Sequence, residues 1–412
     1  MNQVFTLMSG AALAQAIGLG LSFVLTRIYS PEDFGSLEQF AMVLAILGVI
    51  ITGKYEFAIL LPKKEGEASA LTYLAARITL IAGGSVGLLF ILFQGPIARY
   101  FENPDWHWIA WLVGIGLIGF GLTNTIIYRL NREQKYKVIS TSKVLFSFIS
   151  EPLKLAFSFF SASGVSLVLS VAIGHIVTTL FLLNRMPILK KLRTNLELQK
   201  EMANAYKAYP TYNLFGSLLN RLAQWSHIAL FSFFFGPMVI GYLALCRRVA
   251  MLPLTLFSTS FSQVYFRRLT DIEAPDELKN NYLKNLGFLT LIGSAMVGVV
   301  WILPDNTMTF LFGDEWTPVL DYMRILIFWF AANFAVSAVS FVNHRIRAQR
   351  MMFFLDLTHF LLVVSAISIG WKLGYQELDS IKVLVAAKVI YYLIHILATL
   401  RALNRNKIES AS

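Results

Sequence analysis

The sequence predicts an all-α membrane protein of about twelve transmembrane helices, arranged as two six-helix lobes. Of its 412 residues, 56% are hydrophobic and only 14% are charged, a balance that no soluble domain of this size needs. The apolar residues also lie in blocks of roughly 20, the helical length that crosses a hydrocarbon core of about 30 Å. Because lipid offers the backbone no hydrogen-bond partner, each block is expected to be a helix.

The uncharged blocks are the clearest spans. Residues 5–25 and 108–128 contain no charged side chain, and the first block lacks the basic start of a signal peptide. The predicted spans of the first half are residues 5–25, 37–61, 71–94, 107–128, 141–160 and 164–183. Those of the second half are residues 210–235, 239–266, 283–303, 319–342, 351–371 and 381–400.

Basic residues are distributed unevenly among the connections between these spans. The connections after the even-numbered spans hold most of the lysines and arginines, whereas the alternate set is mostly acidic. By the positive-inside rule the basic set faces the cytoplasm, so both termini are expected there, in a bacterial inner membrane. The net charge of +11 is dispersed among short loops, which argues against nucleic-acid binding.

The longest connection divides the chain near its midpoint and is basic. We predict an N-terminal lobe of residues 1–184, a cytoplasmic linker of residues 185–209, a C-terminal lobe of residues 210–402 and a cytoplasmic tail of residues 403–412. A short pattern supports two related halves, because Pro31-Glu-Asp-Phe-Gly35 follows the first span and Pro237-Met-Val-Ile-Gly241 follows the seventh. Six spans per half predict a pseudo-two-fold axis along the membrane normal, an arrangement that places a cavity between the lobes.

Several ionisable residues lie within the predicted spans, where charge is costly and usually faces a bundle interior or a wet cavity. They are Lys54 and Glu56 in span two, Glu151 and Lys154 in span five, Arg221 in span seven, Arg247 and Arg248 in span eight, and Lys388 in span twelve. The excess of cations predicts an anionic substrate, because a phosphate or pyrophosphate needs positive charge and forked donors to replace its water. We therefore predict that the six cations line a substrate cavity and that the two glutamates take part in ion coupling.

Structural interpretations of these charges remain open. Glu151 and Lys154 stand three residues apart on one helix face and can neutralise each other. Lys54 and Glu56 stand two apart, which in a helix argues against pairing, although Lys54 can instead extend to the membrane interface. Only one of two adjacent arginines points straight into a cavity. Histidines on apolar helices, here His175, His227 and His395, are more often buried core residues than proton carriers.

The chain lacks the usual signatures of an enzyme or metalloprotein. It contains no Walker-type loop, nucleophile elbow or HExxH motif, and its one cysteine, Cys246, lies in an apolar block. No cofactor or metal is therefore expected, and transport would draw on an ion gradient or on consumption of the substrate beyond the membrane.

Two stretches near the N-terminus carry a specific resemblance. Thr26-Arg-Ile-Tyr-Ser-Pro-Glu-Asp-Phe-Gly35 is followed by Gly53-Lys-Tyr-Glu-Phe-Ala-Ile-Leu-Leu-Pro-Lys-Lys-Glu65, and weaker echoes occur at residues 236–243, at Pro253 and at residues 261–266. The sequence resembles the polysaccharide-transporter, or O-antigen flippase, family of the multidrug/oligosaccharidyl-lipid/polysaccharide exporter superfamily. The sharp motifs occupy mainly the first third, whereas the resemblance in layout extends over the whole chain.

This resemblance implies a flippase rather than an enzyme. Its substrate would be an oligosaccharide linked to undecaprenyl pyrophosphate, such as the repeat unit of O-antigen in lipopolysaccharide or of another surface polysaccharide. The lobes would move it from the cytoplasmic to the periplasmic leaflet by alternating access, coupled to protons or sodium ions. A polysaccharide polymerase and assembly proteins are the implied partners. A cationic lumen is typical of the family, but its individual residues vary between members.

Two other functions compete with this one. An ion-coupled small-molecule exporter of the same superfamily would share the layout, but drug exporters of that type favour acidic lumens for cationic drugs. A membrane polysaccharide polymerase or ligase would need a large outer loop, and the longest outer connection here is short. A lipid II flippase usually has fourteen spans.

Overall fold

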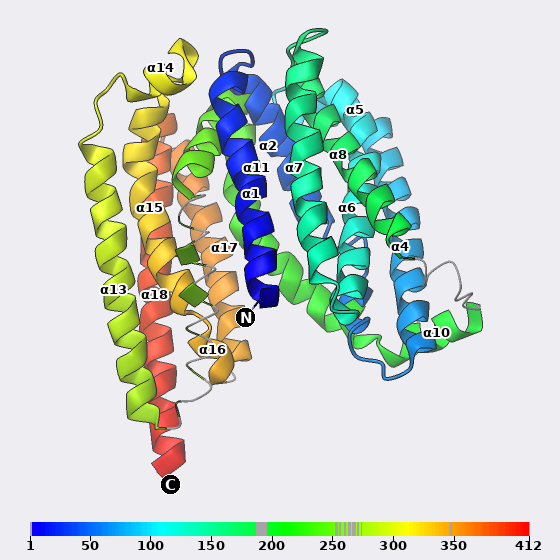
Figure 1. Cartoon of the computed structure of the whole chain (residues 1–412). Helices are drawn as coiled ribbons and strands as arrows, with labels where there is room; N and C mark the ends of the chain where they lie inside the picture. Colours follow the sequence, from blue (N-terminus) through cyan, green and yellow to red (C-terminus); the bar gives the residue numbers. More distant parts are fainter. Residues whose placement is uncertain are drawn as a thin grey trace. The chain divides into compact units, whose positions relative to one another are not determined.

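The computed structural model describes residues 2–186, 196–251, 274–346 and 348–411, together with residues 254, 257, 258, 261, 262, 265, 269 and 272. Pro253, Gln263, Val264 and Phe266 of the family resemblance and residues 187–195 of the predicted linker lie outside the described residues. The described part of the chain is helical and contains no strand (Figure 1). It divides into two compact units, Met1–Gly241 and Tyr242–Ser412.

The N-terminal unit contains the predicted spans of the first half, the described part of the predicted linker and predicted span seven. Its helices are α1 (Asn2–Leu25), α2 (Pro31–Leu47), α3 (Tyr55–Ala58), α4 (Glu65–Leu92), α5 (Gln94–Tyr100), α6 (Trp106–Arg132), α7 (Tyr136–Ser158), α8 (Gly164–Asn184), α10 (Leu196–Ala205), the π-helix η1 (Tyr209–Asn213) and α11 (Leu214–Cys246), whose last residues enter the second unit. Within this unit α1 packs beside α7, and α4 packs beside α6 (Figure 1).

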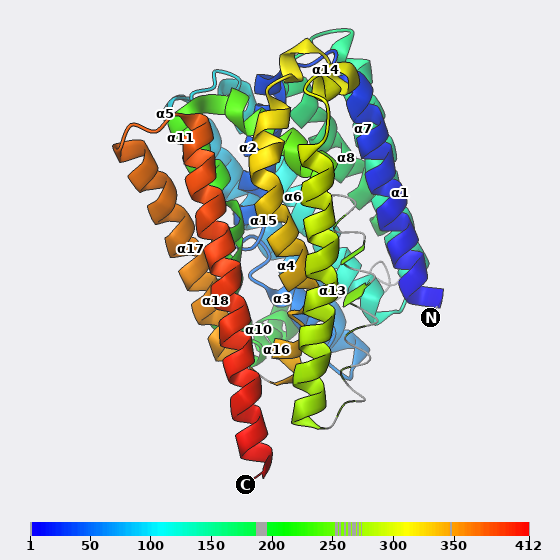
Figure 2. The same ribbon diagram turned by 90° about the vertical axis from the view of Figure 1, so that its left-hand side faces the viewer.

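The C-terminal unit, from Tyr242 onward, contains most of predicted span eight and predicted spans nine to twelve. Its described elements are the π-helix η2 (Arg247–Met251), α13 (Pro275–Trp301), α14 (Thr307–Phe312), the 3₁₀-helix η3 (Asp314–Trp316), α15 (Val319–Val339), α16 (Val342–Arg345), α17 (Gln349–Lys372) and α18 (Glu377–Ala411). Helices α13, α15, α17 and α18 run side by side (Figure 2), with α18 in contact with each of the other three.

Length, composition and surface of these helices fit a membrane. Eight described helical segments are long and apolar enough to cross one. Large apolar side chains also cover their outer faces, among them Leu92, Trp108 and Leu291, which are 66%, 68% and 70% exposed. Water disfavours such surfaces and lipid accepts them. The prediction of an all-α, multi-pass membrane protein is thereby confirmed.

The second predicted span is not one continuous helix, and here the prediction was wrong. Helix α2 ends at Leu47, and a series of turns leads through Gly53 and Lys54, both with positive φ, into the short helix α3. Glycine tolerates this left-handed backbone, but a lysine there is uncommon. Ile51 and Thr52 in the turns are buried, as expected for irregular backbone at membrane depth that is covered by protein.

The predicted short connection between spans seven and eight is present as a sharp turn within α11. Gly236 has φ 76° and ψ −177°, so the helix breaks there, and Pro237 follows directly. Glycine permits this backbone without steric strain, whereas a residue with a Cβ would resist it.

Part of the predicted linker is a folded element of the N-terminal unit. Helix α10 packs on α4, and its Met202 lies in a buried cluster with Tyr55 and Leu71. The Tyr55 hydroxyl donates a hydrogen bond to the Ala203 carbonyl at 3.1 Å. The linker therefore contacts the helix that follows the break in span two.

Candidate functional site

Lys54 and Glu56 form an ion pair at the break in span two. The Lys54 ammonium lies 4.0 Å from a Glu56 carboxylate oxygen and 4.9 Å from the centre of the Phe57 ring. Lys54 is 8% exposed and Glu56 is 5% exposed. The prediction that the two side chains do not pair was wrong, because it assumed a continuous helix and Lys54 instead has a left-handed backbone. Lys54 is therefore buried within the protein and paired with a glutamate.

Glu151 and Lys154 on α7 also form a pair. The Lys154 ammonium donates a hydrogen bond of 2.7 Å to Glu151, and both side chains are buried. The Tyr29 hydroxyl donates to the Lys154 backbone carbonyl at 2.6 Å, which fastens the turn after α1 to α7. The structural interpretation of these two charges, mutual neutralisation on one helix face, is thus confirmed.

Arg221 lies on the exposed surface of α11. Its guanidinium donates a hydrogen bond to the Gln224 side chain at 3.3 Å, and Gln224 in turn donates to Asn220 at 2.7 Å. Arg221 is also among the charges that act on Lys54. The N-terminal unit therefore brings together two of the predicted substrate-binding cations, one buried and one accessible.

Arg247 and Arg248 are the first two residues of η2 in the C-terminal unit. Both side chains are half-buried on this π-helix, which continues directly from α11. A π-helical turn inside an apolar segment is uncommon and often accompanies functional sites. Their role in substrate binding stays a prediction.

Lys388 on α18 is buried among aromatic residues of the C-terminal unit. It is 1% exposed, and its ammonium lies 4.2 Å from the centre of the Trp329 ring on α15. Within the part of the chain that the structure describes, no carboxylate forms an ion pair with it. Lys388 thus differs from Lys54 and Lys154, each of which has a glutamate partner.

The residues around Lys388 were not identified from the sequence. His359 on α17 stacks on Tyr391 of α18, with ring centres 4.2 Å apart and planes inclined by 12°. The Tyr392 hydroxyl donates to the Asn333 side chain on α15 at 2.7 Å. The sequence does show that His359 lies inside an apolar span. It does not show that His359 contacts Tyr391 of another helix, and that contact is what places it in this cluster.

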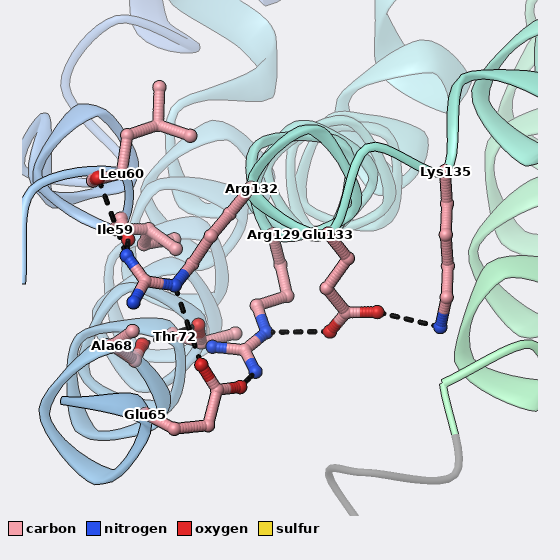
Figure 3. A network of polar contacts seen from close by, with 9 residues as sticks. All are labelled: Ile59, Leu60, Glu65, Ala68, Thr72, Arg129, Arg132, Glu133 and Lys135. Atoms are coloured by element: carbon pink, nitrogen blue, oxygen red, sulfur yellow. Dashed lines mark hydrogen bonds and ion pairs between the residues drawn. The ribbon is translucent and has the colours of Figure 1, made fainter. Parts of the chain in front are cut away.

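A second polar network, at the predicted cytoplasmic ends of α4 and α6, was also missed. Figure 3 shows the Arg129 guanidinium between the carboxylates of Glu65 and Glu133, with which it forms ion pairs. Arg132 reaches Glu65 at 3.4 Å and donates to the backbone carbonyl of Ile59 at 3.2 Å, just after α3. The charge pattern assigned Arg129 to a solvent-facing connection, yet its side chain is fully buried.

The resemblance motif around Pro31 forms a helix start on the predicted outer side. Ser30 and Asp33 cap α2 reciprocally, since the Ser30 hydroxyl accepts from the Asp33 amide and Asp33 accepts from the Ser30 amide. The backbone N–H of Gly164, at the start of α8, donates to both Asp33 and Asp105. Burial raises the pKa of both carboxyl groups above the ordinary value for aspartate.

Among the described residues, no group of three or more histidine, cysteine, aspartate or glutamate side chains is placed to hold a metal ion. Cys246 is buried, and its thiol lies 3.5 Å from the Val319 carbonyl.

Comparison with known proteins places the chain in a family. The sequence model of a family described as polysaccharide biosynthesis protein matches residues 24–321. A comparison with curated proteins gives no match.

Solved structures of similar fold belong to membrane transporters. The lipid II flippase MurJ, in an inward closed conformation, aligns with a TM-score of 0.76 at 15% identity, covering 98% of this chain and 90% of that one. A multidrug resistance MATE family transporter of the MOP superfamily, facing inward, aligns with a TM-score of 0.70 at 14% identity, covering 95% and 96%. A MOP superfamily transporter from Pyrococcus furiosus gives 0.63 at 14% identity, covering 98% and 96%. These likenesses confirm the predicted fold, about twelve membrane helices in two lobes.

Proposed function

Since the chain belongs to the polysaccharide biosynthesis protein family, we propose that it is a flippase for an oligosaccharide linked to undecaprenyl pyrophosphate. It moves the repeat unit of O-antigen or of another surface polysaccharide from the cytoplasmic to the periplasmic leaflet of a bacterial inner membrane. The two units work by alternating access, and both termini lie in the cytoplasm. The flipped unit passes to a polysaccharide polymerase and its assembly proteins.

The observation that supports this substrate is the electrostatic proximity of Lys54 and Arg221 in the N-terminal unit. Two like charges at membrane depth repel each other, and Glu56 offsets only one of them. A diphosphate placed near both would relieve the repulsion, and a guanidinium offers it forked hydrogen bonds. Arg221 is exposed and so is accessible to a headgroup, whereas buried Lys54 supplies a fixed positive charge.

The energy for transport comes from a proton or sodium gradient in this proposal. Glu56 and Glu151 remain candidates for coupling because each holds a lysine, Lys54 and Lys154 respectively. Protonation of either carboxylate, or its binding of sodium, would weaken that ion pair. The freed lysine would then be available to the phosphate or to a conformational change.

The experiment that tests the substrate compares two arginines of the same chain. Arg221→Ala is expected to reduce flipping of a fluorescent lipid-linked oligosaccharide in proteoliposomes by about tenfold or more, because a hydrogen bond to a charged group contributes about 1.5–3 kcal/mol. Arg401→Ala, at an exposed position of α18, is the matched control and should leave the rate unchanged. Equal rates for Arg221→Ala and wild type, at equal reconstituted amounts, would contradict the proposed phosphate contact.

A further inference from the structure

Lys388 occupies an unusual environment for a cation. Lys388 on α18 is 1% exposed, and its ammonium lies over the face of the Trp329 ring on α15. A charge removed from water without a counter-charge is strongly disfavoured, and a cation–π contact offsets that cost only in part. The neutral amine is therefore an accessible state of this side chain.

The titratable groups around Lys388 come from two helices. Tyr391, Tyr392 and His395 follow it on α18 at spacings of three, four and seven, which place them on the same face. Helix α17 contributes His359 and, near Tyr391, Asp356. Helix α15 contributes Trp329 and Asn333, whose side chains do not titrate. The buried Tyr282 of α13 is next to Thr399, which lies farther toward the C-terminal end of α18.

His359 on α17 is an electrostatic neighbour of Lys388. The ammonium acts electrostatically on the imidazole, and the ring is 7% exposed. Its Nε2 atom makes no hydrogen bond to another group in the described part of the chain. Because two positive charges side by side in a buried site repel, the pair favours holding one proton over holding two.

The size of the site limits what it can bind. A side chain that is 1% exposed leaves no access for an oligosaccharide headgroup, and a metal cation would be repelled by the ammonium. A proton needs no volume and reaches buried groups through short-lived water chains.

We infer that Lys388, together with His359, is a proton-binding site within the C-terminal unit, and that it couples a proton gradient to transport; the coupling rests on the proposed function. The proton binds the lone pair of the Lys388 Nζ to give the ammonium, or that of the imidazole to give the imidazolium. No other bond changes, and release of the proton restores the neutral pair. This site belongs to the C-terminal unit, whereas the Glu56 and Glu151 candidates belong to the N-terminal unit.

Proton binding is tested without any transport. Protein labelled with 5-fluorotryptophan gives a fluorine NMR signal for Trp329, assigned by its loss in Trp329→Phe. In the wild type this signal should shift with pH between about pH 5 and 10, the range in which histidine and lysine titrate. Lys388→Met combined with His359→Gln, which removes both proton acceptors, should abolish the shift. Lys388→Arg combined with His359→Gln should abolish it as well, because arginine stays charged throughout.

A matched control and two contrary outcomes complete this test. Lys382→Met removes an exposed lysine of the same helix, which is paired with Asp379. This variant should leave the pH-dependent shift of the Trp329 signal unchanged. A wild-type Trp329 signal that does not move with pH would overturn the inference. A signal that moves at constant pH when chloride is replaced by gluconate would overturn it too, because the site would then bind a small anion.

Coupling is measured separately, as the ratio of flipping rates with and without a pH gradient across proteoliposomes. The wild type and Lys382→Met should show a ratio well above one, and Lys388→Met a ratio of one. If the Trp329 signal shifts with pH but the wild type flips no lipid-linked oligosaccharide, the proposed function fails and the proton site stands. If the wild type flips at the same rate with and without the gradient, the coupling role is overturned.

Discussion

Gly35 at the start of α2 lies directly against the backbone carbonyl of Pro237, so that a Cβ on Gly35 would overlap the carbonyl oxygen. The reciprocal contact also exists, because a Cβ on Gly241 would overlap the Pro31 carbonyl. The two Pro-x-x-x-Gly copies recognised in the sequence therefore contact each other, each glycine against the other copy's proline. The repeat is explained by this contact, since each glycine lets the opposite backbone approach closely.

Alanine at Gly35 or Gly241 is therefore expected to destabilise the protein by about 1–3 kcal/mol, the usual cost of overpacking. Thermal unfolding of the purified protein in detergent measures the effect. Gly20→Ala on α1 is the control, because a Cβ there meets no atom within 4 Å and alanine favours a helix. Equal midpoints for Gly35→Ala and Gly20→Ala would show that the two motif copies are not in tight contact.

Arg129 should be the most important charge of the network in Figure 3. Arg129→Met removes the buried cation between Glu65 and Glu133, which keep Arg132 and Lys135 as partners, and should lower the stability by about 1.5–3 kcal/mol. The measurement is again thermal unfolding. Lys64→Met breaks an exposed pair with Glu67, and its effect should stay within about 1 kcal/mol. Similar losses of stability for the two variants would mean that water solvates the Arg129 guanidinium at this end of α6.

The sequence was sufficient for the class of protein but not for the polar contacts inside it. Apolar blocks predict spans because lipid enforces helices, and each predicted span has a helical counterpart among the described residues. The pairing of Lys54 with Glu56 was missed because periodicity assumes regular backbone. Gly48 and Gly53 were the available signals of the break.

Contacts between distant residues account for the other omissions. His359 matters because α17 and α18 pack together and bring it to Lys388 and Tyr391, which pattern along one helix does not reveal. Arg129 stands in a charged stretch of sequence that is typical of a solvent-facing loop. Its side chain is buried because α4 packs beside α6. The predicted cavity shared by the cations of both lobes stays a prediction.

The Glu151–Lys154 pair predicts non-additive substitutions. Glu151→Gln or Lys154→Met alone breaks this buried ion pair and should cost about 3–5 kcal/mol, whereas the double variant should lose much less. The exposed pair Asp379–Lys382, with the same spacing, is the control, and its variants should change stability by less than about 1 kcal/mol. Additive losses at Glu151 and Lys154 would indicate that the two side chains act independently.

Asp33 and Asp105 predict how stability depends on pH. Because burial in the fold raises the pKa of both carboxyl groups, the folded protein binds more protons than the unfolded chain above the ordinary value of about 3.9. Acidification from neutral pH toward that value should therefore stabilise the fold, and this contribution is lost again as pH rises through the raised pKa. The charge of Asp105 also contributes to the raised pKa of Asp33.

Asp105→Asn removes one of these carboxylates and the repulsion that it exerts on Asp33. The variant should unfold at a higher temperature than the wild type at pH 7, because it no longer holds a buried charge there, and its midpoint should change less between pH 7 and about pH 5. The Asn amide keeps an oxygen that accepts the Gly164 N–H, so the start of α8 retains a hydrogen-bond partner. Asp314→Asn, at an exposed position of η3, is the control and should follow the wild type at both pH values. A wild-type midpoint that falls on acidification, together with a less stable Asp105→Asn at pH 7, would mean that the Gly164 hydrogen bonds outweigh burial and that the ionised pair stabilises this end of the unit.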